Sequence, residues 1–217
     1  MIEFEEIRNA AIIRHGSQAV EARMPVVKTQ EELRDIPSDR LLSMMSLRIF
    51  RAGLKHSVVD GKWPAFEEVF HGFDVPRVAA MGDEDIESLL GDARLIRHMG
   101  KLRAVRHNAM VMQEIGDFAG WIADWPSSDI VGLWAALGKR MSQLGGNFGP
   151  MFLRMTGKDT FVLTPSVTSA FGQWKLADTP LGGKSGARVA QAVFNAYVEE
   201  TGLPLAHLSM IMAMSVD

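Results

Sequence analysis

The segment Leu144-Gly-Gly-Asn-Phe-Gly-Pro150 is the part of the sequence best suited to bind an anion. Its glycines permit a tight loop, and we expect one helix before this loop and another that starts at Pro150. Such a corner can direct backbone N–H groups and a helix N-terminus at a phosphate, whatever the base sequence. An ordinary glycine-rich helix–helix connection has the same composition, so the segment alone does not decide between these two interpretations.

Basic side chains before and after this segment are further candidates for phosphate contacts. Arg94, Arg97 and Lys101 recur at intervals that place them on one face of a helix. Lys139 and Arg154 flank the glycine-rich segment more closely. A solvated helix face explains the same charges, so the basic run does not by itself indicate nucleic-acid binding.

Several other chemistries are excluded or disfavoured by residue type. The chain has no cysteine, which excludes disulfides, thiolate zinc sites, cysteine-ligated iron–sulfur clusters and a cysteine nucleophile. Its six histidines form no H-x-x-x-H or H-E-x-x-H pair, so we expect no histidine metal site. Leu181-Gly-Gly-Lys-Ser185 resembles the end of a P-loop, but Asp178 stands where the first glycine is required. We therefore expect no cofactor.

Composition and charge describe a globular chain. The 217 residues are 47% hydrophobic and carry a formal net charge of −3, so attraction to a polyanion has to come from a local basic patch or from helix N-termini. The segment Met1–Glu6 is acidic and has no unbroken apolar core, so it is neither a secretory signal nor a membrane anchor. We expect a cytoplasmic protein without a membrane partner.

The elements that position these residues are predicted to be helices. The apolar stripe that begins at Leu42 and Met45 predicts a core-facing helix from Leu41 to about Val59, ended by Asp60-Gly61. Only Thr160–Leu163 suggests a strand, so the predicted class is all-α. Further helices are expected over roughly residues 94–115, 184–200 and 203–214, and another follows Ser128-Asp129 and stops before the glycines at 145 and 146.

Helix-start signals support the same class. Thr29-Gln-Glu-Glu32 has the spacing of a capping box, and Pro37-Ser38 predicts a second helix start soon after it. Thr164-Pro165 is typical of an N-cap followed by proline at the first helical position. The length fits one domain over residues 1–217, built as a single body or as two closely packed helical lobes.

A series of short motifs within residues 41–113 closely resembles the DNA-3-methyladenine glycosylase I family. Their order and spacing match over about a third of the chain. In that family a glycine-rich hairpin follows at the place of residues 144–150, so the resemblance favours the hairpin over an ordinary connection. The motifs are Arg51-Ala-Gly-Leu54, Phe66-Glu-Glu-Val-Phe70, Phe73-Asp74, Val78-Ala-Ala-Met81, Asp85-Ile-Glu87, Asp92-Ala-Arg-Leu-Ile-Arg-His98, Gly100-Lys101 and Asn108-Ala109.

The resemblance implies a helix-hairpin-helix DNA glycosylase fold and double-stranded DNA containing a damaged base as the partner. Proteins of this superfamily flip a damaged nucleotide into a pocket and hydrolyse its N-glycosidic bond while the hairpin holds the phosphate backbone. The implied DNA contacts are Gly146, Asn147, Phe148, Gly149, Lys101 and Arg154. The implied base pocket is Arg48, Gly53, His56 and Trp63.

The sequence departs from the family at the residues that matter most for an alkylated base. A glutamate that recognises the cationic base in the family is Arg48 here, and the expected stacking aromatic is His56. A guanidinium about 4 Å from a cationic base would cost roughly 4 kcal/mol at an effective dielectric constant near 20. Either Arg48 points away from the base, or the substrate is a different lesion.

The catalytic aspartate of the wider superfamily is also replaced. Its place at a helix start falls on Ser166, which cannot supply a negative charge to an oxocarbenium ion. Asp159 lies nearby in the sequence but before the helix.

Three hypotheses follow from these observations. The first is a base-excision glycosylase acting on a flipped, alkylated purine similar to 3-methyladenine. The second is a catalytically degenerate relative that binds DNA without excising a base. The third is a helical enzyme or scaffold unrelated to DNA.

Overall fold

Helices account for all regular structure in the computed structural model, which describes residues 1–178 and 181–216. No strand occurs within these ranges, so the all-α class is confirmed and Thr160–Leu163 does not form a strand. The chain divides into two compact units. Unit 1 contains Met1–Lys28, Trp125–Leu133 and Gly157–Asp217, and unit 2 contains Thr29–Asp124 and Trp134–Thr156.

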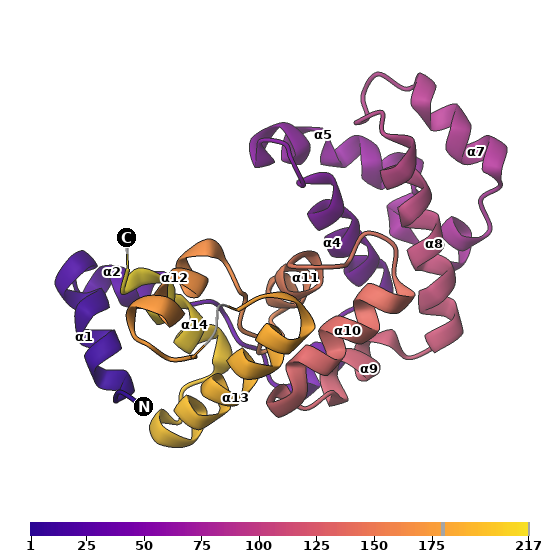
Figure 1. The fold of residues 1–217 in the computed structure, drawn as a ribbon. Helices are drawn as coiled ribbons and strands as arrows, with labels where there is room; N and C mark the ends of the chain where they lie inside the picture. Colours follow the sequence, from indigo (N-terminus) through magenta and orange to yellow (C-terminus); the bar gives the residue numbers. More distant parts are fainter. Residues whose placement is uncertain (179–180, 217) are drawn as a thin grey trace. The chain divides into compact units, whose positions relative to one another are not determined.

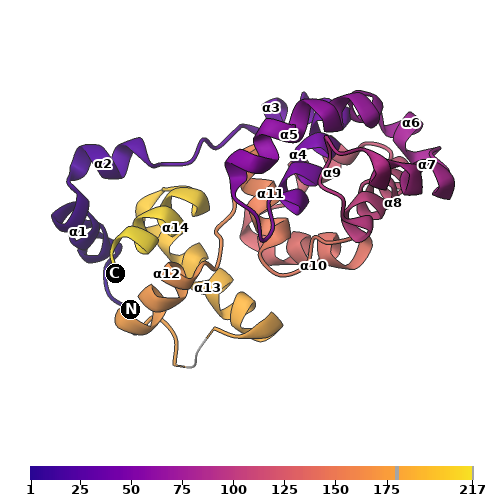
Figure 2. The same cartoon turned by 90° about the horizontal axis from the view of Figure 1, so that it is seen from above.

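Each unit is a separate group of helices (Figures 1 and 2). Unit 1 holds α1 (Phe4–His15), α2 (Ser17–Ala22), the 3-10 helix η3 (Ser127–Asp129), α12 (Pro165–Gln173), α13 (Gly183–Thr201) and α14 (Leu205–Met214). Unit 2 holds α3 (Gln30–Arg34), α4 (Ser38–Phe50), α5 (His56–Val69), η1 (His71–Phe73), α6 (Val75–Ala79), α7 (Asp83–Ser88), η2 (Leu89–Gly91), α8 (Met99–Ile115), α9 (Phe118–Asp124) and α11 (Phe148–Thr156). Helix α10 (Ile130–Arg140) begins in unit 1 and ends in unit 2.

Predicted helix starts are confirmed where a capping side chain specifies them. Thr29 and Glu32 form the capping box in front of α3, with the Thr29 amide donating to the Glu32 carboxylate over 2.7 Å. Helix α4 begins at Ser38, directly after Pro37, and has no side-chain cap, so there the proline alone marks the start. The Thr164 hydroxyl accepts from the Val167 amide at the start of α12. A short polar side chain satisfies an amide that the first helical turn leaves without a partner, which explains why these starts are legible in the sequence.

The predicted helix from Leu41 to Val59 is wrong. Helix α4 ends at Phe50, the chain turns through a Gly53 residue with φ +75°, and α5 starts at His56. The apolar stripe misses this break because only the backbone conformation at Gly53 interrupts it. Helix α5 then continues through Asp60-Gly61 and Pro64, whose ring deprives the exposed Asp60 carbonyl of its helical donor.

Aromatic rings join α4, α5 and η1 in the core of unit 2. The Trp63 ring stacks on Phe66 with centroids 5.0 Å apart and on Phe73 with centroids 5.4 Å apart. Its indole N–H donates to the Ser43 hydroxyl over 3.1 Å. Phe66 and Phe73 are fully buried, so the half-buried Trp63 ring is anchored to the core of unit 2.

A half-buried ion pair closes the same junction. The Arg40 guanidinium donates to both carboxylate oxygens of Glu67, over 3.0 and 2.9 Å, and to the Gly72 carbonyl. The Ser43 hydroxyl donates to Glu67 over 2.6 Å. Burial raises the pKa of Glu67, but the hydrogen bonds from Arg40 and Ser43 outweigh it and lower the pKa below its ordinary value. This carboxylate therefore ties α4 to α5 and η1.

Unit 1 has its own aromatic core. Phe161 and Phe194 stack with centroids 4.4 Å apart, and Phe171 packs against Phe194 from α12. Phe4 contacts the Tyr197 ring at 5.0 Å, which holds α1 against α13. Burial raises the pKa of Tyr197 to about 12.

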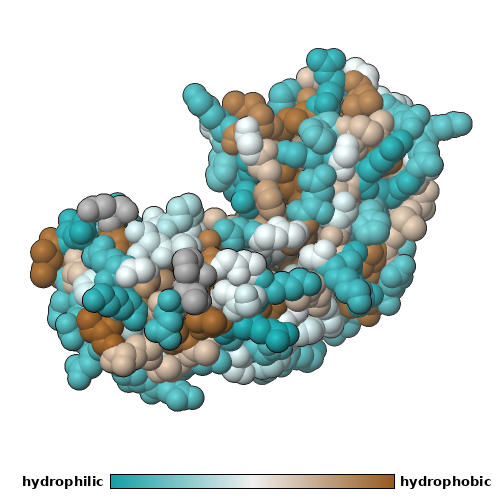
Figure 3. Space-filling view, in the orientation of Figure 1, coloured by the Kyte–Doolittle hydropathy of each residue, from teal (hydrophilic) through white to brown (hydrophobic). Residues whose placement is uncertain are grey.

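The visible surface mixes polar and apolar side chains on both units (Figure 3). Across residues 1–178 and 181–216, none of the helices combines the length and the apolar character that a membrane span requires.

We expect Glu67→Gln to lower the free energy of unfolding by about 1–2 kcal/mol near neutral pH, a value reduced for the partial exposure of the pair. Because the pKa of Glu67 is depressed in the folded protein, its stabilisation is complete above its ordinary value of 4.5 and disappears as the pH falls. Urea unfolding across this range measures the difference.

Glu68→Gln is the matched control for this measurement. Glu68 is the next residue and pairs with Arg94 over 2.9 Å, but both side chains are more than half exposed. Its loss should change stability by less than about 0.5 kcal/mol. Equal effects of the two substitutions would show that the Glu67 network does not hold the junction.

Candidate functional site

The glycine-rich segment forms an exposed loop between α10 and α11. Gly145, Gly146 and Asn147 are exposed, and α11 begins at Phe148, two residues before the predicted start at Pro150. The amides of Phe148 and Gly149 donate to carbonyls of the same loop, each over 3.2 Å. The amides of Gly145 and Gly146 donate to no other described residue, so they are available to a ligand.

Glycine is required at two places in this loop. Gly146 has φ +57°, which lies in the left-handed region that favours glycine. At Gly149 a Cβ atom would lie 2.9 Å from the Leu144 carbonyl oxygen and 3.7 Å from the Leu137 side chain. A side chain at position 149 would therefore push the loop away from α11.

A buried asparagine on α8 holds the chain that leads into the loop. Asn108 has no exposed surface, and its amide group donates to the Ser142 carbonyl over 3.1 Å and accepts from the Ser142 amide over 2.7 Å. A ring nitrogen of His107 lies 3.1 Å from the Arg140 carbonyl oxygen. Sequence reasoning gave Asn108 no role. The available signal was a polar residue within the buried stripe of a helix, which requires a partner in the core.

Arg48 lies where α4 packs against α11. Its guanidinium carbon is 4.9 Å from the centre of the Phe148 ring, so the cation covers the first residue after the loop. Its Nε–H is buried and has no acceptor. Among residues 1–178 and 181–216, Arg48 has neither a hydrogen bond nor an ion pair. Burial and the nearby charge of Arg51 lower the pKa of its guanidinium.

The other cations near Arg48 already have partners. Arg51 pairs with Asp60 over 2.7 Å. Lys101 is buried, with 8% of its surface exposed. Its ammonium donates to the carbonyls of Phe50, over 3.3 Å, and Ala52, over 2.8 Å. Lys101 therefore satisfies the C-terminal end of α4, in the interior rather than on the surface that a phosphate contact requires.

The remaining predicted pocket and DNA residues have different environments. Gly53 and His56 are exposed on the turn between α4 and α5, and His56 makes no hydrogen bond with a described residue. Trp63 is half-buried and packed between Phe66 and Phe73 as described above. Arg154 is half-buried on α11. Unit 2 thus contains Arg48, Gly53, His56, Trp63, Lys101, Arg154 and the loop.

Ser166 and Asp159 belong to unit 1. Ser166 is half-buried in the first turn of α12. The two carboxylate oxygens of Asp159 accept from the amides of Leu205, over 3.1 Å, and Ala206, over 2.9 Å. Asp159 therefore stabilises the N-terminus of α14, where a negative charge is favourable.

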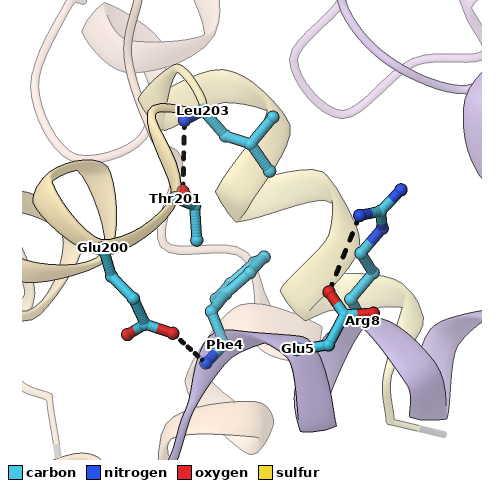
Figure 4. Close-up of a pocket in the computed structure, with 6 residues that line it drawn as sticks. All are labelled: Phe4, Glu5, Arg8, Glu200, Thr201 and Leu203. Carbon is cyan, nitrogen blue, oxygen red and sulfur yellow. Dashed lines mark hydrogen bonds and ion pairs between the residues drawn. The ribbon is translucent and has the colours of Figure 1, made fainter.

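A hollow of about 310 Å³ lies in unit 1 between α1 and the end of α13 (Figure 4). The Phe4 amide donates to Glu200 over 2.7 Å, and Arg8 lies 3.6 Å from Glu5. The polar groups that line the hollow mainly bond to one another, and the Phe4–Glu200 hydrogen bond among them joins α1 to α13. None of the predicted site residues lines it.

The sequence similarity to known proteins lies in the same segment that carries the motifs. The methyladenine glycosylase family model matches residues 34–135. DNA-3-methyladenine glycosylase 1 of Escherichia coli (strain K12) is 43% identical over 72 residues, which are 33% of this chain and 38% of that protein. DNA-3-methyladenine glycosylase of Haemophilus influenzae is 33% identical over 86 residues, which are 38% of this chain and 46% of that protein. The chain thus spans less than half the length of these curated relatives.

A solved structure extends the likeness beyond this segment. The crystal structure of a 3-methyladenine DNA glycosylase I is 28% identical, with a TM-score of 0.50 over 64% of this chain and 86% of that one. A second, in complex with 3-methyladenine, is 22% identical and shares the fold with the same TM-score. The resemblance to the DNA-3-methyladenine glycosylase I family is therefore confirmed.

We expect Asn108→Ala to destabilise unit 2 by about 1–3 kcal/mol, because the half-buried Ser142 backbone groups lose both hydrogen bonds to Asn108. Hydrogen exchange of the Ser142 amide, followed by NMR, should accelerate together with a loss of thermal stability. Gln113→Ala, at an exposed position of the same helix, is the control and should have little effect. Unchanged exchange at Ser142 in Asn108→Ala would contradict the assigned role.

Proposed function

We propose, from its relationship to the DNA-3-methyladenine glycosylase I family, that this chain is a DNA base-excision glycosylase. It would hydrolyse the N-glycosidic bond of a flipped, alkylated purine similar to 3-methyladenine in double-stranded DNA. The observation that carries this proposal is the exposed loop of Gly145–Asn147, which Asn108 holds and which leaves the amides of Gly145 and Gly146 available.

The loop suits the sugar-phosphate strand better than a base edge. Main-chain amides recognise charge and geometry, so contacts from Gly145 and Gly146 would hold any sequence. Asn147, Phe148 and Gly149 complete the proposed hairpin, in which the glycines allow the strand to approach the backbone closely. These backbone contacts would fix the position of the DNA strand while one nucleotide rotates out of the duplex.

The extruded base would meet the turn between α4 and α5. Gly53 and His56 are exposed there, and the imidazole can stack on a base or donate a hydrogen bond. Trp63 would support this turn from the core, since its ring stacks on the buried Phe66 and Phe73. Arg48 lies on the same segment but is stacked on Phe148.

The chemistry demands little of the protein. An alkylated purine such as 3-methyladenine is cationic and is already a good leaving group, so binding the base and admitting water account for most of the task. Ser166 lies in unit 1 and offers a hydroxyl that can hydrogen-bond a water but supplies no charge. Asp159 would supply negative charge only by giving up its two amide hydrogen bonds on α14.

A second function is favoured by the same replacements. The family carboxylate positions hold Arg48 and Ser166, and the Asp159 carboxylate is already engaged. A relative that binds damaged or abasic DNA without releasing a base is consistent with this set of residues. The two functions differ in one observable, which is the release of a free base.

Release of free bases from alkylated duplex DNA, measured by chromatography and mass spectrometry, tests the proposal. We expect the native protein to release alkylated purines and Gly149→Ala to release them roughly tenfold more slowly, because the added Cβ displaces the loop. Gly172→Ala is the control, since nothing lies within 4 Å of the added atom. Binding to abasic DNA without base release would support the degenerate relative, and no DNA binding at low salt would contradict both functions.

A further inference from the structure

We infer that Arg48 is an anion-binding residue that holds a phosphodiester of the DNA strand beside the loop of Gly145–Asn147. The inference rests on the proposed function for the identity of the ligand as DNA. The structural reason for an anion is that the half-buried Arg48 side chain has neither a hydrogen-bond acceptor nor a counter-ion in the described chain.

An unpaired guanidinium in this position is unfavourable in the free protein. Its Nε–H is removed from water without gaining an acceptor, and its charge is partly desolvated next to the charge of Arg51. Buried charges in proteins are ordinarily paired or bound to a ligand. A ligand with negatively charged oxygens would relieve both costs at Arg48.

The protein itself provides no carboxylate for Arg48. Asp60 is paired with Arg51. The Lys101 ammonium adds a further positive charge nearby, and burial and the charge of Arg48 both lower the pKa of Lys101. Three cations therefore gather at the end of α4 with one carboxylate among their contacts in the described residues. The local field favours an anion although the whole chain carries a net charge of −3.

The position of Arg48 identifies the kind of anion. Its guanidinium covers the ring of Phe148, which directly follows the exposed loop. Stacking on a ring leaves the in-plane N–H groups of a guanidinium able to make paired hydrogen bonds with phosphate oxygens. The unpartnered amides of Gly145 and Gly146 lie in the loop that directly precedes Phe148, and they offer further donors to the same strand.

This assignment also accounts for the reversed charge at position 48. An arginine neutralised by a phosphodiester repels a cationic base much less than a free guanidinium does. The same DNA strand would then supply the counter-charge and the damaged base. Arg48 would act as a DNA-binding and positioning residue rather than as a reader of the base.

The experiment measures the dissociation constant of a duplex with an abasic-site analogue at a series of salt concentrations. Arg48→Gln should weaken binding about tenfold, and the slope of log Kd against log salt should fall by about one, the value for one lost phosphate contact. Arg48→Lys should keep the slope but recover only part of the affinity, because an ammonium cannot form the paired contact.

Arg77→Gln is the matched control, since it removes one exposed arginine from α6 of the same unit. It should change the slope far less than Arg48→Gln. Thermal unfolding checks folding, and Arg48→Gln should be at least as stable as the native protein. A slope unchanged by Arg48→Gln, or lowered equally by Arg77→Gln, would overturn the inference.

Further arms separate the possible sources of the effect. Inorganic phosphate that stabilises the native protein but not Arg48→Gln, without any DNA binding, would replace DNA by free phosphate and overturn the assignment. A changed lesion preference with an unchanged salt slope would make Arg48 a reader of the base and overturn it as well. DNA binding that depends on Arg48 in a protein that releases no base would support the inference while the glycosylase proposal fails.

Discussion

The packing of α4 against α11 places an unpaired cation on the first residue after an exposed, glycine-rich loop. Arg48 covers Phe148 and has no counter-ion in the described chain, so the free protein keeps a half-buried charge that only a ligand can neutralise. The proposed role of Arg48 as an anion-binding residue depends on this contact. The loop amides add donors beside it, and the turn at Gly53 places His56 on the same segment of chain.

Several buried polar contacts keep that arrangement in place. Asn108 fixes Ser142 ahead of the loop, and Lys101 satisfies the carbonyls where α4 ends. The Arg40–Glu67 pair ties α4 to α5 and η1. Asn108 and Lys101 both belong to α8, so one helix holds the chain ahead of the loop and the end of α4. Preorganisation of this kind reduces the entropy lost when a strand binds.

Much of the fold was predictable from the sequence, and the errors have identifiable causes. Helix starts were legible at Thr29 and Thr164, because a capping side chain acts within one turn. The break between α4 and α5 was not legible, because it depends on the φ of Gly53 and on a lysine about fifty residues further along the chain. Lys101 was predicted on a DNA surface and lies in the core for the same reason. Long-range contacts decided both positions.

The candidate site was predictable only in outline. The loop of residues 144–150 was identified and is exposed, but the amides of Phe148 and Gly149 are used inside the loop. The role of Asn108 was missed, because its partner is 34 residues away in the sequence. The charge at position 48 was recognised as unusual, yet its contact with Phe148 requires the packing of two helices that are distant in the chain.

The most direct test of the account is the side-chain NMR signal of the Arg48 Nε–H group, assigned by comparison with Arg48→Lys and followed while an abasic duplex is added. The account predicts a large change in its chemical shift and slower exchange with water at saturation, as a phosphate oxygen accepts from the guanidinium. A signal that stays unchanged when the duplex is fully bound would contradict it.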